Sequence, residues 1–214
     1  PDVLRLVDRY DEHVAFADAP SARIASALGE APADRRPLLV LASDHGEAFM
    51  QHGSQGHNAT VHAEMLHVPL VFHAPGLLAP AVVGESAGLV DLARTLAEVC
   101  GPWREPGAGG RARADVGLGL APAPAPREFF FSSRYKARLA QMQLGFASGE
   151  WKLVHDGATG CSRLYDLAAD PLETRDLASD RPDLARAMEA RLVAWYAERR
   201  ATVSATGGAE PAPA

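Results

Sequence analysis

The chain has 214 residues, enough for one ordinary domain with at most a small second one. Its net charge is −6 and it has no basic block, which excludes the usual profile of a nucleic-acid-binding protein. No apolar run reaches the length of a bilayer span. The two cysteines, Cys100 and Cys161, form neither a disulfide framework nor a paired zinc motif.

The first predicted element is a helix over residues 2–28, where apolar residues recur at steps of three, four or seven. Pro20 falls inside this run and is expected to kink or split the helix. His13 and Asp18 are predicted to be solvated positions on it.

A run of apolar residues over 38–42 predicts a strand that is buried on both faces. Asp44 and His45 follow where this strand ends, and ligands of open α/β sheets bind just beyond the carboxyl ends of strands. A carboxylate beside an imidazole suits a divalent metal. The same residues could instead form a plain turn in which Asp44 bonds its own backbone.

The next elements are a loop that carries His52 and His57, a short helix within 60–66, and a second buried strand over 68–73. Asp91 is predicted to cap a helix that ends near Gly101. Residues 102–126 are rich in Gly, Ala, Pro and Arg, which is typical of a linker.

Beyond the linker, alternating apolar residues over 129–167 predict an antiparallel meander with turns at 148–150 and 156–160. Lys152 is expected to be a solvated cation on one of its strands. A last helix is predicted from about 180, and its apolar stripe comprises Leu184, Met188, Leu192 and Trp195.

Two stretches resemble the sulfatase family of the alkaline-phosphatase superfamily. Residues 38–76 carry an apolar strand, Ser-Asp-His-Gly-Glu, a His-Gly loop, Gly-His and His-Val-Pro-Leu, and they end near Pro-Gly. Residues 149–177 carry Gly-Glu-Trp-Lys-Leu and Leu-Tyr-Asp-Leu-x-x-Asp-Pro-x-Glu-Thr-x-x-Leu. The resemblance extends more weakly over about residues 5–198.

The resemblance implies an α/β fold: part of a doubly wound, mostly parallel sheet of alkaline-phosphatase type, plus a small C-terminal antiparallel sheet with a packed helix. Residues 1–101 would be the C-terminal part of the catalytic domain, and 102–126 the linker. Residues 127–200 would form the C-terminal subdomain and 201–214 a disordered tail. The chain is expected to be the C-terminal portion of a longer protein.

The resemblance also assigns site residues. Asp44 and His45 match half of the family's metal site, which most often implies calcium, with manganese, magnesium and zinc left open. His57 matches a position that contacts the ester group, where a catalytic histidine could stabilise the anion or protonate the leaving oxygen. The alternative for His57 is a surface loop histidine. His52 either lines the substrate site or holds the loop.

Other polar residues nearby are predicted to be structural. Glu47 is expected to orient the loop, and His62, His67 and His73 to have no chemical role.

The nucleophile is not identifiable. Family sulfatases use a formylglycine made from Cys or Ser in Cys/Ser-x-Pro-x-Arg near the N-terminus. Residues 100–104, Cys-Gly-Pro-Trp-Arg, fit this short pattern, but they follow the Asp-His strand and end a helix, whereas an anion-binding motif should open one. The formylglycine is therefore expected upstream of the chain.

The predicted function is hydrolysis of a small-molecule or glycan sulfate ester, with no nucleic-acid partner. The alternatives are a phosphoester hydrolase or phosphoryl-group transferase of the same superfamily, and a non-catalytic truncated module. The resemblance implies a periplasmic, secreted or membrane-anchored protein, and the oligomeric state is not predicted.

Overall fold

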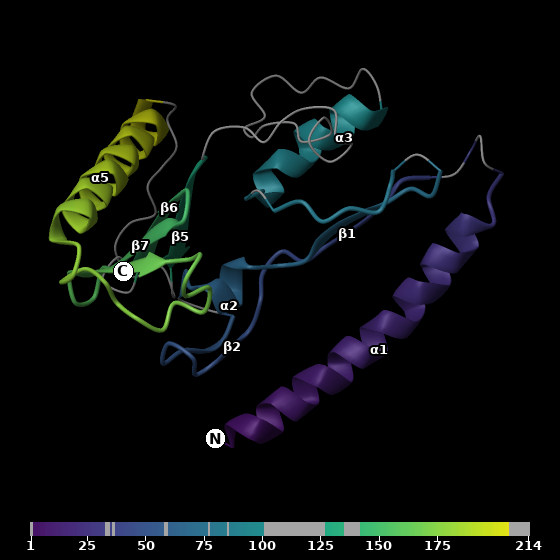
Figure 1. Ribbon diagram of the computed structural model, residues 1–214, viewed down its shortest axis with the longest axis horizontal. Helices are drawn as coiled ribbons and strands as arrows, with labels where there is room; N and C mark the ends of the chain where they lie inside the picture. The colour runs from purple at the N-terminus through teal and green to yellow at the C-terminus, as the bar shows by residue number, and fades with distance from the viewer. Residues whose placement is uncertain are drawn as a thin grey trace. The chain divides into compact units, whose positions relative to one another are not determined.

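The computed structural model describes residues 2–32, 35, 37–57, 60–76, 78–84, 86–100, 127–134 and 142–205 (Figure 1). The chain divides into two compact units, Pro1–Asp44 with Val68–Ala125, and His45–His67 with Pro126–Ala214. The predicted linker and the end of the predicted tail, residues 206–214, lie outside the described residues.

The first unit begins with helix α1 (Val3–Gly29), and it also contains β1 (Leu39–Ala42), β4 (Leu70–His73), a short 3₁₀ turn η2 (Leu89–Asp91) and α3 (Leu92–Cys100). Helix α1 continues through Pro20, so the expected split does not occur. A proline removes one hydrogen bond from a helix, and the other turns of this 27-residue helix remain formed. His13 and Asp18 are exposed on it, as predicted.

Strands β1 and β4 pair antiparallel, from Leu39 opposite His73 to Ala42 opposite Leu70. Within the described residues this ribbon has two strands, and Leu41 and Val71 are about half exposed. The prediction of a strand that is buried on both faces is therefore wrong for the described residues, and a parallel sheet is not confirmed. An apolar run predicts a strand, but it does not specify the direction or number of neighbouring strands.

The second unit is built on a four-stranded antiparallel meander, which confirms the prediction for this part of the chain. Its strands are β5 (Glu128–Arg134), β6 (Met142–Ser148), β7 (Trp151–Asp156) and β8 (Cys161–Asp166), in that spatial order.

Helix α5 (Pro182–Ala205) packs on one face of this sheet through its predicted apolar stripe. Met188 and Leu192 contact a buried cluster that comprises Leu144, Phe146, Leu153 and Leu164. The helix continues to Ala205, past the predicted start of the tail at 201. Among the described helices, none is both long enough and apolar enough to cross a bilayer.

The opposite face of the sheet is covered by residues 45–67, which we call the histidine segment. It contains β2 (Ala48–Phe49), β3 (Gln55–Gly56) and α2 (Ala63–Leu66), and in Figure 1 the sheet lies between α5 and α2. Val61 packs with Val154 and Tyr165, and a Cβ on Gly145 would lie only 3.2 Å from the Val61 side chain. The sheet is therefore buried on both faces.

Lys152 lies on this second face and is only 3% exposed. The prediction of a solvated cation is wrong, because an alternating strand leaves one face to solvent only when nothing covers that face.

Candidate functional site

The histidine segment brings two of the predicted site residues together. The rings of His45 and His57 stack with their centroids 4.8 Å apart and their planes 17° from parallel. His57 directly follows β3, and its Nδ1–H donates to the Glu47 carboxylate at 3.2 Å. Glu47 therefore orients the ring of His57, which agrees with its predicted role.

Hydrogen bonding favours one tautomer of each ring. Because a backbone carbonyl only accepts, the contact of 2.8 Å between His45 Nδ1 and the Gly46 carbonyl places the proton on Nδ1. In the neutral rings of His45 and His57, Nε2 then carries the lone pair, and this is the nitrogen that can bind a metal or exchange a proton.

Gly46 is required where the segment passes α2. Its N–H donates to the Met65 carbonyl at 2.9 Å, and a Cβ on Gly46 would lie 2.0 Å from the Glu64 carbonyl oxygen. No side chain fits at that distance, so the glycine permits the close approach that precedes Glu47.

His52 belongs to a second, more buried cluster. Its Nδ1 donates to the Glu64 carboxylate at 2.9 Å and its Nε2 donates to the Glu173 carbonyl at 2.9 Å. Of the two predicted roles for His52, holding the loop is the one that these bonds support.

The centre of this second cluster is the Glu173 carboxylate, which is 2% exposed. It accepts from His62 Nδ1 at 2.6 Å and from Lys152 Nζ at 2.5 Å. His62 stacks on His52 at 3.8 Å, and its Nε2 is buried with no hydrogen-bond partner among the described residues. His67 and His73 are exposed and lie outside both clusters.

The charges of this cluster stabilise one another. Burial alone would raise the pKa of Glu173, but the hydrogen bond from His62 and the charge of Lys152 hold that pKa below its usual 4.5. Burial lowers the pKa of Lys152 below its usual 10.5, although Glu173 opposes this shift. Burial also raises the pKa of Tyr165, which packs edge-on against His62, to about 12.

His52, His62 and Glu173 offer ligand atoms within 4.8 Å of one another, yet this arrangement does not fit a metal ion. A bound metal lies in the plane of each imidazole that holds it, whereas the rings of His52 and His62 are 6° from parallel and 3.8 Å apart. Both nitrogens of His52 and both oxygens of Glu173 are also engaged. The cluster is a structural network of charges.

A sequence profile of the sulfatase family matches residues 2–102, which include Asp44, His45, His52 and His57. This part of the chain is therefore similar to the sulfatase family.

Arylsulfatase K of Mus musculus is 27% identical to the chain over 190 residues, which are 86% of the chain and 34% of that protein. Arylsulfatase K of Homo sapiens is 24% identical over 190 residues, which are 86% of the chain and 35% of that protein. The chain therefore spans about a third of the length of these curated relatives.

Solved structures with similar folds include the phosphonate monoester hydrolase of Agrobacterium radiobacter, with a TM-score of 0.69 and 25% identity over 86% of this chain and 40% of that one. A 2-O glycosaminoglycan sulfatase has a TM-score of 0.63 and 22% identity, and the match covers 85% of this chain and 40% of that one.

Sulfatases imply a divalent metal, and the predicted ligands have suitable chemistry. Asp44, exposed, is the last residue of the first unit and follows β1 by one intervening residue. His45 is the first residue of the second unit, and its Nδ1–H is fixed by the Gly46 carbonyl, an arrangement typical of metal-bound histidines. A carboxylate oxygen and an imidazole nitrogen fit calcium less closely than manganese or zinc, but they exclude none of them.

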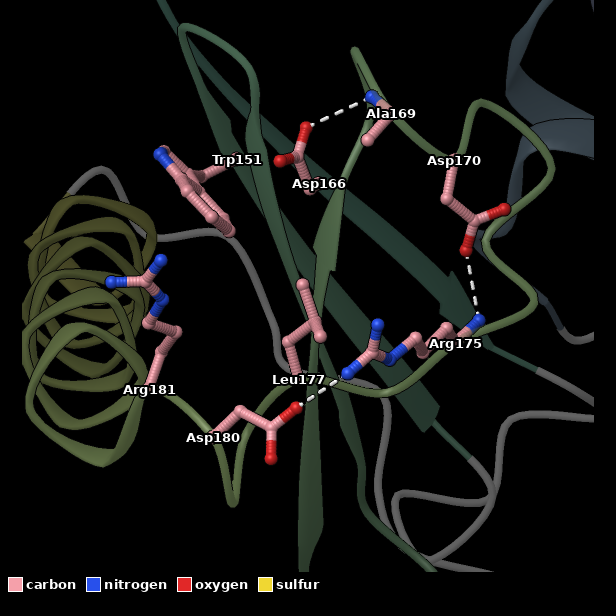
Figure 2. Close-up of a pocket in the computed structure, with 8 residues that line it drawn as sticks. All are labelled: Trp151, Asp166, Ala169, Asp170, Arg175, Leu177, Asp180 and Arg181. Carbon is pink, nitrogen blue, oxygen red and sulfur yellow. Dashed lines mark hydrogen bonds and ion pairs between the residues drawn. The ribbon is translucent and has the colours of Figure 1, made fainter.

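A hollow of about 560 Å³ lies elsewhere in the second unit, between the ends of β7 and β8 and the loop that leads to α5 (Figure 2). Its carboxylates brace that loop: Asp166 accepts from the Ala169 N–H, and Asp170 accepts from the Arg175 N–H. None of the residues that line it is a histidine. We therefore place the candidate chemistry at Asp44 and in the histidine segment.

Sequence reasoning missed Glu64, Lys152 and Glu173. Glu173 stands in the Asp-Pro-x-Glu string of the second resembling stretch, which was a usable signal. Nothing local indicated that the string would contact His52 and His62, which lie far earlier in the chain.

Proposed function

We propose that the chain supplies half of the divalent-metal site and the ester-contacting histidine of a sulfuric ester hydrolase. The observation that carries this proposal is the sulfatase match over the residues that hold Asp44, His45 and His57. The stacking of His45 on His57 supports the proposal. It places the imidazole proposed to bind the metal, that of His45, next to the imidazole proposed to exchange a proton, that of His57.

His57 would act through Nε2, since Nδ1 is engaged by Glu47. In its protonated form the ring can donate to a sulfate oxygen or pass its proton to the leaving oxygen. Asp44 and His45 would hold the cation, with calcium as the first candidate. When bound, the cation supplies electrostatic stabilisation of the negative charge on the ester oxygens.

The proposed substrate class is a small-molecule or glycan sulfate ester. The arylsulfatase names of the curated relatives support a sulfate ester over a phosphate ester.

Calorimetric titration with calcium, and separately manganese, tests the metal site. We expect weak binding, with a Kd on the order of 10⁻⁴–10⁻³ M, because two side chains supply few of the six to eight oxygen ligands that calcium prefers. Asp44→Ala and His45→Ala should abolish the binding. Asp18→Ala, which changes an exposed carboxylate on α1, is the matched control and should leave it unchanged. Micromolar binding that survives Asp44→Ala would show that the site lies elsewhere.

A further inference from the structure

The hairpin that carries His57 is too short to hold its own geometry. Strands β2 and β3 share two residue pairs, Ala48 with Gly56 and Phe49 with Gln55. An isolated two-stranded hairpin is marginal in water even when it is longer. Met50, at the start of its turn, has a φ of 72°, a conformation that is unfavourable for a residue with a side chain. Contacts from outside the hairpin must hold it.

His52 makes those contacts from the tip of the hairpin. It lies in the turn between β2 and β3, and its side chain is 13% exposed. One ring nitrogen is bonded to Glu64 on α2 and the other to the backbone carbonyl of Glu173, in the loop after β8. The tip is therefore fixed to the loop that follows the last strand of the sheet.

Glu173 is itself held in an unfavourable backbone conformation, with a φ of 57°. A residue keeps such a conformation only where contacts with the surrounding structure hold it there. Here the carboxylate is fixed between His62 and Lys152, and all three side chains are nearly fully buried. The charge pair orients Glu173, and the orientation of Glu173 directs its carbonyl toward His52.

We propose that Glu173, supported by Lys152 and His62, is a positioning residue for His57 and acts through His52 and the β2–β3 hairpin. The role of His57 in this statement rests on the proposed function. The C-terminal sheet would then determine where the ester-contacting histidine lies, although the two are far apart in the sequence.

Hydrogen–deuterium exchange of the 214-residue chain tests the connection with two variants that interrupt it at different points. Glu173→Gln keeps the shape and an acceptor for His62 but removes the counter-charge of Lys152. His52→Phe keeps the ring that stacks on His62 but removes both N–H donors. Each variant should raise exchange in peptides over 45–57 by roughly tenfold or more, because hydrogen bonds to charged groups are lost. Peptides over β6–β8 and α5 should change by less than about twofold.

Glu189→Gln is the matched control. Like Glu173, Glu189 on α5 pairs with a histidine, His155, but it lies on the opposite face of the same sheet and also accepts a hydrogen bond from the Ser162 hydroxyl. It should leave exchange over 45–57 unchanged.

The ¹⁵N signals of the His57 ring provide a readout that a purely structural role would not move. With the hairpin in place, Nδ1 should be the protonated nitrogen of the neutral ring, because the Glu47 carboxylate accepts a hydrogen bond from Nδ1–H. In His52→Phe the two nitrogens should shift toward a mixture of tautomers.

Unchanged exchange over 45–57 in His52→Phe overturns the proposal, and this variant decides the case if Glu173→Gln unfolds the chain. Equal loss of protection in α5 also overturns it, because the network would then serve stability alone. If the natural chain binds neither calcium nor manganese while both variants raise exchange over 45–57, the proposed function is rejected and the connection from Glu173 to the hairpin stands.

Discussion

At the scale of single residues, Lys152 and Glu173 are tolerable only as a pair. Each is almost fully buried, and an unpaired charge at such a position costs several kcal/mol. Their contact of 2.5 Å, together with the bond from His62, offsets that cost. Removal of one partner should therefore be far more damaging than neutralisation of both, for which Lys152→Met/Glu173→Gln is the suitable variant.

The pH dependence of stability should report this pair. Because the pKa of folded Glu173 lies below 4.5, the folded state binds this proton more weakly than the unfolded state does. The resulting stabilisation is fully present above pH 4.5 and is lost as the pH falls through the lowered pKa. Urea titrations at several acidic pH values should show a steeper decline for the natural chain than for Lys152→Met/Glu173→Gln. Equal slopes would mean that Glu173 is not the titrating group.

At the scale of elements, the sequence predicted what depends on local periodicity. The meander and the stripe of α5 were correct because alternation and helical spacing are local signals. The covering of the second face by the histidine segment was not predictable in this way, since the covering residues precede the sheet by a long stretch of chain. For the same reason, β1 and β4 were both recognised as strands, while their antiparallel pairing was not.

The packing of α5 on the sheet can be tested with two adjacent residues. Leu192 is 1% exposed in the main cluster, whereas Val193 is 61% exposed. Leu192→Ala should lower the free energy of unfolding of the second unit by about 2–5 kcal/mol, because it leaves a cavity beside Leu153 and Leu164. Val193→Ala should change it by less than about 0.5 kcal/mol. Urea denaturation followed by tryptophan fluorescence measures both, and equal effects would contradict the packing described.

At the scale of the whole molecule, the sulfatase match crosses from one compact unit into the other, and Asp44 and His45 stand on either side of that boundary. The residues proposed for chemistry form short local motifs, so the sequence alone was enough to nominate them as candidates. The network that supports them joins three separate parts of the second unit, α2, β7 and the loop after β8. Such a network depends on tertiary contacts and is therefore invisible to motif reasoning.

Turnover of a sulfate ester by the chain depends on the nucleophile. A covalent mechanism needs an attacking group, and Cys100 begins the only linear match to the family's nucleophile pattern that we recognise. Cys100 is the last residue of α3, where the helix dipole disfavours an anion, whereas a helix N-terminus would stabilise one. We therefore expect the 214-residue chain, with calcium or manganese, to hydrolyse neither a chromogenic aryl sulfate nor an aryl phosphate. Cys161→Ala, at an exposed thiol, is the control for Cys100→Ala. Aryl sulfate turnover that disappears in Cys100→Ala and persists in Cys161→Ala would make Cys100 the nucleophile.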